Sequence, residues 1–362
     1  MLKILRNNKK ILGSAIILVF LALVFYSSLN HLNNHQKQLI KKYLLPYMFI
    51  NQQQAKISEQ QKELNILEEY LTQLELNEIR NIKITKSKIN LLGNKILKKY
   101  KLSKGFSFGI HEKNPGSGYI DFYDNKIFVI SSRGLLAFSK DLIDDEESFK
   151  TIKNNISDFI GVKQFIKNRW FSIKDILIWQ NQIYVSYTDE IKEDCWNTSV
   201  IRGNINYKSI KFKKLYSADE CVHSVNNVDK IFNAHQSGGR IIPFDNNSIL
   251  LTIGDYRSRH LAQDKESVNG KIIMIDINNN KKEIISMGHR NPQGLYFDED
   301  NNFILETEHG PNGGDEINLI EVNETAKMEI PNYGWAISSA GEHYGGRNID
   351  NKKIYEKYPL HK

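Results

Sequence analysis

The sequence predicts an all-β fold, a β-propeller, preceded by an N-terminal transmembrane helix and a helical spacer. From Gly118 onward, helical periodicity gives way to short strands of β-branched and aromatic residues separated by polar turns. A two-strand unit then recurs about every 55 to 65 residues, which is longer than the strand-to-strand spacing of a sandwich. An apolar run preceded by basic residues near Met1 indicates the transmembrane helix.

The recurring unit places Asn or Asp in a tight turn between two strands. Its copies are YIDFYDNKIFVIS from Tyr119, DILIWQNQIYVSY from Asp175, RIIPFDNNSILLTIG from Arg240 and GLYFDEDNNFILETE from Gly294. We therefore expect about four blades within residues 106–362. No further strand that would close a ring follows, so either this propeller is incomplete at its C-terminal end or its ring is open and its edges need a partner. We expect the first.

Residues 1–10 form a basic tail, and the apolar run ILGSAIILVFLALVFYS begins at Ile11. Positive charge before the run predicts a cytoplasmic N-terminus, with everything after about residue 29 on the exoplasmic (periplasmic) side. A cleaved signal peptide has the same basic start and apolar core. Because no small-x-small cleavage pattern follows, the sequence favours a retained single-pass anchor over residues 11–28.

Residues 29–105 are predicted to form a helical spacer. Ile57, Leu64 and Leu71 lie seven residues apart, and Leu67 and Leu74 lie at the complementary offset of a heptad seam. Such a seam over residues 57–74 is typical of a short coiled coil that joins identical chains, or of an amphipathic helix that packs on its own chain. The proline at position 46 is expected to end or kink any helix that leaves the membrane.

Composition excludes some functions. The formal net charge is +7, but the lysines are scattered and do not alternate with aromatic residues, so no nucleic-acid partner is expected. Two cysteines, Cys195 and Cys221, cannot build a zinc ribbon or an iron–sulfur cluster within this chain. They either form a disulfide in an oxidising compartment or remain free buried thiols, and their spacing favours neither.

Three segments carry reactive or conformationally special residues. They are NAHQSGGRI (233–241), GHRNPQGL (288–295) and EHGPNGGDEIN (308–318). Each lies at an end of a predicted inner strand. Since inner-strand ends of a propeller converge on one face around the central channel, we expect the three segments to meet there.

Together with LLTIGD, GKIIMIDI and NYGW, these segments resemble, in order and spacing, the soluble PQQ-dependent glucose dehydrogenases and aldose sugar dehydrogenases, the glucose/sorbosone dehydrogenase family. The resemblance covers about residues 106–362 and implies a six-bladed propeller. It also implies an oxidoreductase that depends on pyrroloquinoline quinone (PQQ) and calcium. Such an enzyme oxidises an aldose or a similar sugar by hydride transfer to PQQ and passes electrons to a further acceptor.

The resemblance also implies roles for individual residues. His235 matches the general base that takes the proton of the sugar hydroxyl, and Arg290 matches the arginine that stabilises negative charge on the quinone. Asn291 and the neighbouring glutamine at position 293 are expected to contact PQQ beside Arg290. Gly310 and the proline at position 311 match residues whose main-chain carbonyls bind the calcium ion.

Other residues are assigned structural roles. Asp255, Asp315 and Glu316 are expected to cap backbone donors, and Trp335 is expected to pack in the interior. Position 234 is alanine, where some family members carry an acid before the histidine, and the basic residues that hold the PQQ carboxylates in the family come from later blades. The alternative function is therefore a catalytically inactive propeller that binds envelope carbohydrate or a protein partner.

Overall fold

The computed structural model describes residues 33, 46–78, 81–102, 106, 118–141, 148–322, 329–341 and 360–361. By compactness the chain divides into two units, Met1–Asn65 and Ile66–Lys362. The long helix α3 (Pro46–Glu78) runs across this division. It begins at the proline that was expected to end or kink a helix, and proline is well tolerated in a first helical turn because its missing N–H would have no helical partner there.

The heptad seam of α3 is exposed. The exposed fractions of Ile57, Leu64 and Leu71 are 62%, 53% and 58%. Ile66, off the seam, packs against a core of the second unit.

Among the described helices, none has the length and apolar content that crossing a bilayer requires. The basic tail at 1–10 and the expected anchor at 11–28 lie outside the described residues.

Residues 81–101 form strands, so the prediction of a helical spacer up to residue 105 is wrong for this segment. β1 (Asn81–Lys83) pairs with β7 (Ser148–Asn154), and β2 (Thr85–Asn90) pairs with β3 (Ile96–Lys101) in a hairpin. In β2, Thr85, Ser87 and Ile89 alternate with two lysines, a period of two that suits a strand. Gly93, with φ of 72°, allows the turn between β2 and β3.

Residues 118–321 fold into four successive sheets, and each sheet begins with one of the four predicted hairpins. In hydrogen-bonded order, the sheets are β4-β5-β6-β7-β1, β8-β9-β10-β12, β14-β15-β16-β17 and β18-β19-β20. The first sheet has β4 (Gly118–Tyr123), β5 (Lys126–Ser131) and β6 (Leu136–Asp141) before β7, and the second has β8 (Ile173–Trp179), β9 (Gln182–Lys192), β10 (Cys195–Asn204) and β12 (Lys213–Tyr216). The third has β14 (Gly238–Asp245), β15 (Ser248–Ile253), β16 (Lys271–Asp276) and β17 (Lys282–Met287), and the fourth has β18 (Pro292–Asp298), β19 (Phe303–Glu308) and β20 (Glu316–Glu321). The all-β prediction is confirmed.

Short elements complete the described chain. They are η1 (Leu92–Asn94), η3 (Ile156–Asp158), α4 (Val162–Lys167), η4 (Arg259–Gln263), β11 (Ser209–Ile210), β13 (Val222–His223), β21 (Ser338–Ser339) and β22 (Leu360–His361).

The hairpin turns use the residues that the repeated unit singled out. Asp124 and Asn125 have φ of 49° and 55°, Gln180 and Asn181 have φ of 51° and 60°, and Asn302 has φ of 54°. These left-handed conformations disfavour most side chains but are tolerated by Asn and Asp. The prediction of four polar-turn hairpins is confirmed.

The second and third sheets are buried on both faces. In β8, Ile176 and Ile178 belong to the core shared with the first sheet, whereas Leu177 belongs to the core shared with the third. In β15, Leu251 packs toward the second sheet and Leu250 toward the fourth. Successive strand residues point to opposite faces, so these continuous apolar runs fill two cores at once.

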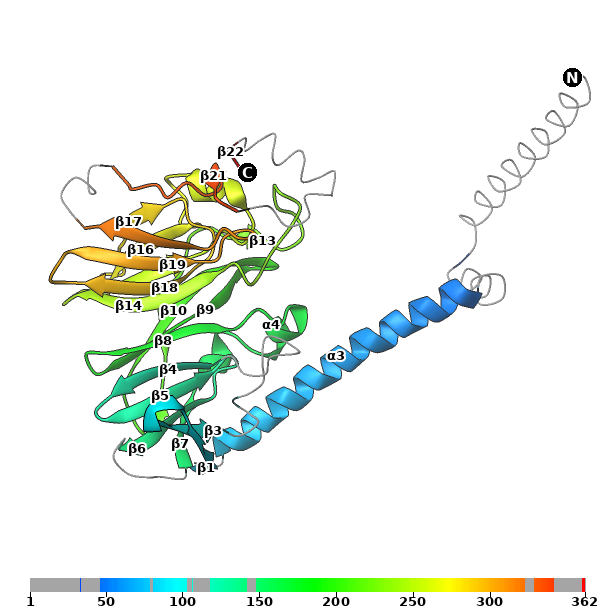
Figure 1. The fold of residues 1–362 in the computed structure, drawn as a ribbon. Coiled ribbons are helices and arrows are strands. Elements are labelled where there is room, and N and C mark those ends of the chain that lie inside the picture. The colour runs from blue at the N-terminus through cyan, green and yellow to red at the C-terminus, as the bar shows by residue number, and fades with distance from the viewer. Residues whose placement is uncertain are drawn as a thin grey trace, which may run out of the picture. The chain divides into compact units, whose positions relative to one another are not determined.

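Polar contacts tie the first strands of neighbouring sheets, which follow one another in the order β4, β8, β14 and β18 (Figure 1). The carboxylate of Asp121 on β4 accepts the backbone N–H of Ile178 on β8 at 2.5 Å. The carboxylate of Asp175 on β8 accepts the backbone N–H of Ile241 on β14 at 2.9 Å and binds Arg240 through both oxygens at 3.1 Å. Burial raises the pKa of Asp175 to about 6, and Arg240 opposes this rise.

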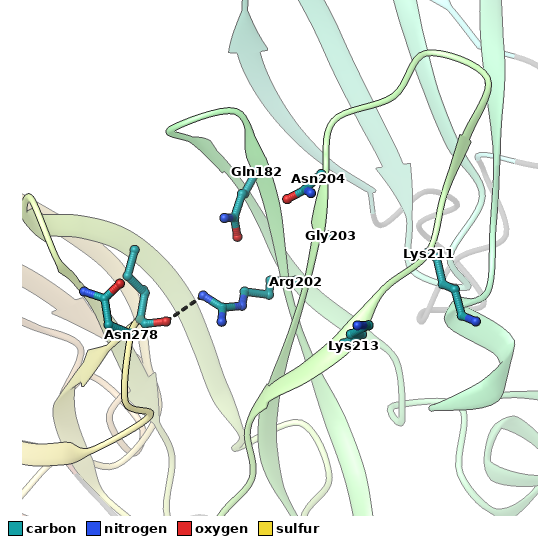
Figure 2. Close-up of a pocket in the computed structure, with 8 residues that line it drawn as sticks. Gln182, Arg202, Gly203, Asn204, Lys211, Lys213 and Asn278 are labelled. Atoms are coloured by element: carbon teal, nitrogen blue, oxygen red, sulfur yellow. Dashed lines mark hydrogen bonds between the residues drawn. The ribbon is translucent and has the colours of Figure 1, made fainter.

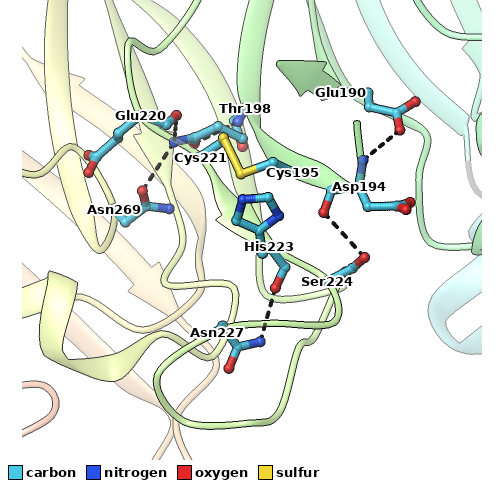
Figure 3. Close-up of a disulfide and its surroundings, with 11 residues drawn as sticks. Glu190, Asp194, Cys195, Thr198, Glu220, Cys221, His223, Ser224, Asn227 and Asn269 are labelled. Atoms are coloured by element: carbon cyan, nitrogen blue, oxygen red, sulfur yellow. Dashed lines mark hydrogen bonds between the residues drawn. A yellow bond between two sulfur atoms is a disulfide. The ribbon is translucent and has the colours of Figure 1, made fainter. Parts of the chain in front are cut away.

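Cys195 and Cys221 form a disulfide with 26 residues of sequence separation (Figure 3). Cys195 starts β10, and Cys221 immediately precedes β13, whose His223 pairs with Cys195. The disulfide therefore attaches residue 221 to the start of β10, and residue 221 begins the segment 221–235, which ends at His235. Of the two alternatives that the sequence left open, the structure has the disulfide.

Replacing both cysteines by alanine is expected to lower the free energy of unfolding by about 3 to 4 kcal/mol, since the unfolded chain regains the freedom of a loop of this length. Urea denaturation of the oxidised wild type and the double variant measures the difference. Wild type unfolded under reducing conditions should match the double variant, and a loss below about 1 kcal/mol would contradict the expectation.

Candidate active site

Three loops predicted to converge lie in contact around the ends of β14, β18 and β19. The side-chain oxygen of Asn291 accepts the backbone N–H of Gly238 at 3.1 Å, which joins the second predicted segment to the first. The backbone N–H of His309 donates to the carbonyl of Asn291 at 3.2 Å, which joins the third segment to the second. The structure therefore brings together His235, Arg290 and the loop at Gly310.

His235 is partly buried, and its ring lies tilted against that of Trp170, with 5.0 Å between the ring centroids. Burial, reinforced by the positive charge of Arg290 and then of Lys174, lowers the pKa of His235 to about 4. The imidazole is therefore neutral near pH 7, as a group that accepts a proton must be.

Arg290 is held on several sides. One terminal nitrogen donates to the carbonyl of His309 at 2.6 Å, and the guanidinium carbon lies 5.4 Å from the ring centroid of Trp335. Its backbone N–H donates to a carboxylate oxygen of Glu308 at 2.5 Å, and its carbonyl accepts the N–H of Asp255 at 2.9 Å. Because the residue is also buried, its guanidinium has a fixed direction.

A buried carboxylate and an amide support this arginine. With its amide oriented to satisfy its neighbours, Gln236 donates to Asp255 at 2.9 Å and accepts from the guanidinium of Arg290 at 2.8 Å. Asp255 also accepts the indole N–H of Trp335 and the backbone N–H of Arg257, each at 2.7 Å. Asp255 thus caps a backbone donor as expected, and Trp335, which is 4% exposed, is a packing residue as expected.

The glycine loop after β19 is held by hydrogen bonds between its own residues. A side chain at Gly310 would collide with the carbonyl of Gly314, and the N–H of Gly310 donates to the carboxylate of Asp315 at 3.0 Å. Asp315 therefore caps a backbone donor, as the sequence predicts. The carbonyl of Pro311 accepts the N–H of Gly314 at 2.9 Å and keeps a second lone pair for another partner.

The remaining predicted residues differ in placement. Asn291 is buried and uses its side-chain oxygen on Gly238, so within the described contacts it holds the loop of His235. Gln293 has an exposed side chain, and its carbonyl accepts the side chain of Arg240 at 3.1 Å. Ala234 is buried in the core that contains Trp196, so this chain presents no acid at that position.

Sequence reasoning missed two cations that act on His235, namely Lys174 and Arg257. Lys174 lies on β8, where burial lowers its pKa to about 7, and its amine donates to the carbonyl of Trp170 at 2.8 Å. Arg257 follows Asp255 in a left-handed conformation with φ of 69°. A lysine inside the apolar run of β8 was the available signal for the first, whereas nothing in the sequence marked the second.

A pocket of about 420 Å³ lies elsewhere, at the far ends of the second and third sheets (Figure 2). In it Arg202 donates to the carbonyl of Ile277 at 2.6 Å. Its lining is Gln182, Arg202, Gly203, Asn204, Lys211, Lys213, Ile277 and Asn278. None of the predicted site residues lines this pocket, so we place the candidate active site by the convergence of its residues.

Comparison with known proteins finds a family model described as glucose/sorbosone dehydrogenase, which matches residues 178–359, half of the chain. The aldose sugar dehydrogenase YliI of Escherichia coli is 30% identical over 137 residues, covering 34% of this chain and 35% of that protein. Quinoprotein glucose dehydrogenase B of Acinetobacter calcoaceticus is 33% identical over 131 residues, covering 28% of this chain and 26% of that protein. A solved structure of the soluble Escherichia coli aldose sugar dehydrogenase in its apo form has a TM-score of 0.45 at 20% identity, covering 67% of each chain.

The matches to the two curated dehydrogenases therefore span about a third or less of those proteins' lengths, at 35% and 26%. The family match includes all three predicted segments, since it runs from β8 past β20.

In the free protein, His235 is expected to gain its proton between about pH 5 and pH 3, because its pKa is lowered to about 4. The unfolded chain protonates near pH 6.5, so this residue costs the native state stability as the pH falls from 6.5 to 4. Nuclear magnetic resonance of histidine-labelled protein, with His235 assigned from a His235→Gln spectrum, measures the titration. Arg257→Gln should raise the pKa of His235, because it removes a positive charge that lowers this pKa. Lys282→Gln should leave the pKa of His235 unchanged, because Lys282 is not among the charges that act on His235. A His235 midpoint near 6.5 in the wild type would contradict the expectation.

Proposed function

Because the chain belongs to the glucose/sorbosone dehydrogenase family, we propose that it is a PQQ- and calcium-dependent oxidoreductase that oxidises an aldose or a similar sugar. We propose further that its four sheets are propeller blades. The observation that carries the proposal is a neutral His235 beside a fixed Arg290. The relatives named as an aldose sugar dehydrogenase and a quinoprotein glucose dehydrogenase support the reaction class.

The charge of the site suits PQQ, which carries three carboxylates. Arg290, Lys174 and Arg257 all act on His235. Two carboxylates act on Arg257: Asp255, which is occupied by Gln236, Trp335 and a backbone N–H, and Asp229, which accepts the backbone N–H of Arg259. An excess of positive charge around a partly buried site attracts an anionic cofactor. When bound, PQQ would supply the acceptor for the hydride that leaves the sugar carbon.

The proposed role of His235 is to take the proton of the sugar hydroxyl as the hydride leaves the same carbon. In the free protein its low pKa makes it available but weakly basic. Anionic groups bound beside it would raise its pKa toward the range in which general bases work best.

Arg290 is proposed to stabilise negative charge that develops on the acceptor. Its contacts with His309, Gln236 and Trp335 fix its orientation before the reaction, so little reorganisation is needed when the charge appears.

The loop of Gly310 suits calcium in the chemistry of its donors. It offers main-chain carbonyls at Gly310 and Pro311, and no side chain fits at Gly310. Calcium prefers such oxygen ligands, and here it would polarise the cofactor. Asp315 orders the loop by binding the N–H of Gly310.

We also propose that residues 11–28 anchor the chain in a membrane with its N-terminus in the cytoplasm and the sheets on the exoplasmic side. The disulfide supports an oxidising compartment. The exposed seam of α3 supports association with a second copy of the chain through residues 57–74. A separate electron acceptor is proposed as a further partner.

The activity is tested with the full chain, PQQ, calcium, an aldose and a reducible dye. Wild type is expected to reduce the dye, and His235→Ala should lower the turnover number by about 1,000-fold, the usual contribution of a general base. His223→Ala, at an exposed histidine on β13, should keep wild-type turnover.

Binding of PQQ by wild type should raise the pKa of His235, a readout that does not depend on turnover. Sugar binding without PQQ and without dye reduction would instead favour an inactive carbohydrate-binding propeller.

Leu64→Cys tests topology and association together. In intact cells a membrane-impermeant maleimide should label this exposed position, and mild oxidation should join two copies of the chain, since Leu64 lies on the seam. Lys62→Cys, exposed but off the seam, should be labelled without joining copies. Labelling only after cell lysis would overturn the exoplasmic location, and equal crosslinking of both variants would overturn the seam.

A further inference from the structure

A buried group of one histidine and two glutamates lies beneath the loop that carries Arg290. The Nδ1 atom of His289 is 3.6 Å from a carboxylate oxygen of Glu308 and 3.8 Å from one of Glu306. Ligand-type atoms of the three residues all lie within 4.8 Å of one another. Their side chains are 0%, 2% and 0% exposed, so bulk water does not solvate them.

The fourth sheet builds this group through its register. Glu306 and Glu308 are two residues apart on β19, so both point to the same face. On β20, Asn318 is paired with Glu306 and Glu316 with Glu308, which adds an amide and a third carboxylate on that face. The Asn318 amide donates to Glu306 at 3.0 Å and lies 3.4 Å from Glu308 and 3.3 Å from Glu316.

Two atoms of this group have no hydrogen-bond partner among the described residues. They are Nδ1 of His289 and Oε1 of Glu306, and both are fully buried. The Glu306 oxygen that lies 3.8 Å from Nδ1 is the other one, Oε2, which accepts the Asn318 amide. The other ring nitrogen of His289 lies 2.8 Å from the hydroxyl of Ser286. If that nitrogen carries the proton and donates to Ser286, Nδ1 presents a lone pair toward the carboxylates, as in metal sites where a hydrogen bond fixes the tautomer of the ligand.

The separations are too long for hydrogen bonds but fit ligands around a small ion. A histidine nitrogen donates to a carboxylate at about 2.7 to 2.9 Å. Ligand atoms about 2.0 to 2.2 Å from a tetrahedral zinc ion lie roughly 3.3 to 3.6 Å from one another. The observed 3.6 Å and 3.8 Å are close to the second arrangement.

We propose that His289, Glu306 and Glu308 bind a divalent transition-metal cation such as zinc. An imidazole nitrogen with carboxylate oxygens selects this class, whereas the loop of Gly310 offers carbonyl oxygens and suits calcium. A cation would also offset the repulsion between two buried carboxylates.

This site would position the candidate active-site arginine. The second carboxylate oxygen of Glu308 accepts the backbone N–H groups of Arg290 and Asn291, at 2.5 Å and 3.2 Å. A cation on the first oxygen would therefore hold this carboxylate, and through it the loop that Arg290 occupies. Metal binding itself does not depend on the proposed sugar oxidation.

The test uses the full chain, stripped with a chelator and then titrated with zinc in the absence of PQQ. Elemental analysis after gel filtration should find one tightly held equivalent in wild type, and the melting temperature should rise with zinc. Glu306→Gln should weaken the binding of that equivalent about 100-fold. Glu299→Gln, on the exposed turn before β19, should bind as wild type does.

Folding of the variant is controlled without metal. Glutamine has the size and shape of glutamate and keeps a side-chain oxygen that can accept the Asn318 amide. Glu306→Gln in chelator should thus melt near the metal-free wild type.

If the variant does not fold, X-ray absorption of zinc-loaded wild type decides. One histidine nitrogen with oxygen neighbours supports the site, and oxygen ligands alone overturn it. Failure of wild type to retain an equivalent, or equal retention by Glu306→Gln, also overturns the proposal.

Discussion

The polar contacts between the first strands of successive sheets are the constraint on which the arrangement depends. Asp121 and Asp175 each sit on one first strand and accept a backbone N–H from the next, while Asn291 accepts the N–H of Gly238 across the following junction. Side chains that bind a neighbouring backbone fix the register between sheets, which apolar packing alone would leave free to slide. Two of the candidate active-site segments adjoin first strands, at β14 and β18, and the Gly310 loop follows β19, which pairs with β18. The same contacts therefore help to set where the loops meet.

The electrostatics of the site follow from this convergence. Cations come from three sheets, with Lys174 on β8, Arg257 after β15 and Arg290 before β18. They surround one histidine and suppress its protonation, and the carboxylate of Asp255 is taken up in holding Gln236 and Trp335. Positive charge of this kind favours an anionic ligand and keeps His235 neutral.

The fourth sheet carries two buried glutamates, Glu306 and Glu308, on β19. Glu308 links the two levels, because one of its oxygens binds the backbone of Arg290 while the other faces His289. Buried carboxylates at this density are costly unless they are neutralised. The cation-rich site and the buried carboxylates are therefore directly connected. The connection is the hydrogen bond from the backbone N–H of Arg290 to the side chain of Glu308.

Short-range sequence patterns were enough to predict the hairpins and the candidate site segments of this protein. The four hairpins could be predicted because alternating apolar residues and Asn or Asp turns act over a few neighbours, and the three site segments stood out by their glycines and polar residues. The tertiary structure decided the strands within 81–101, the disulfide between Cys195 and Cys221, and the placement of Lys174, Arg257 and the His289 group. Each of these depends on which distant segments become neighbours and on how much water they exclude, and the sequence pattern around a single residue contains neither.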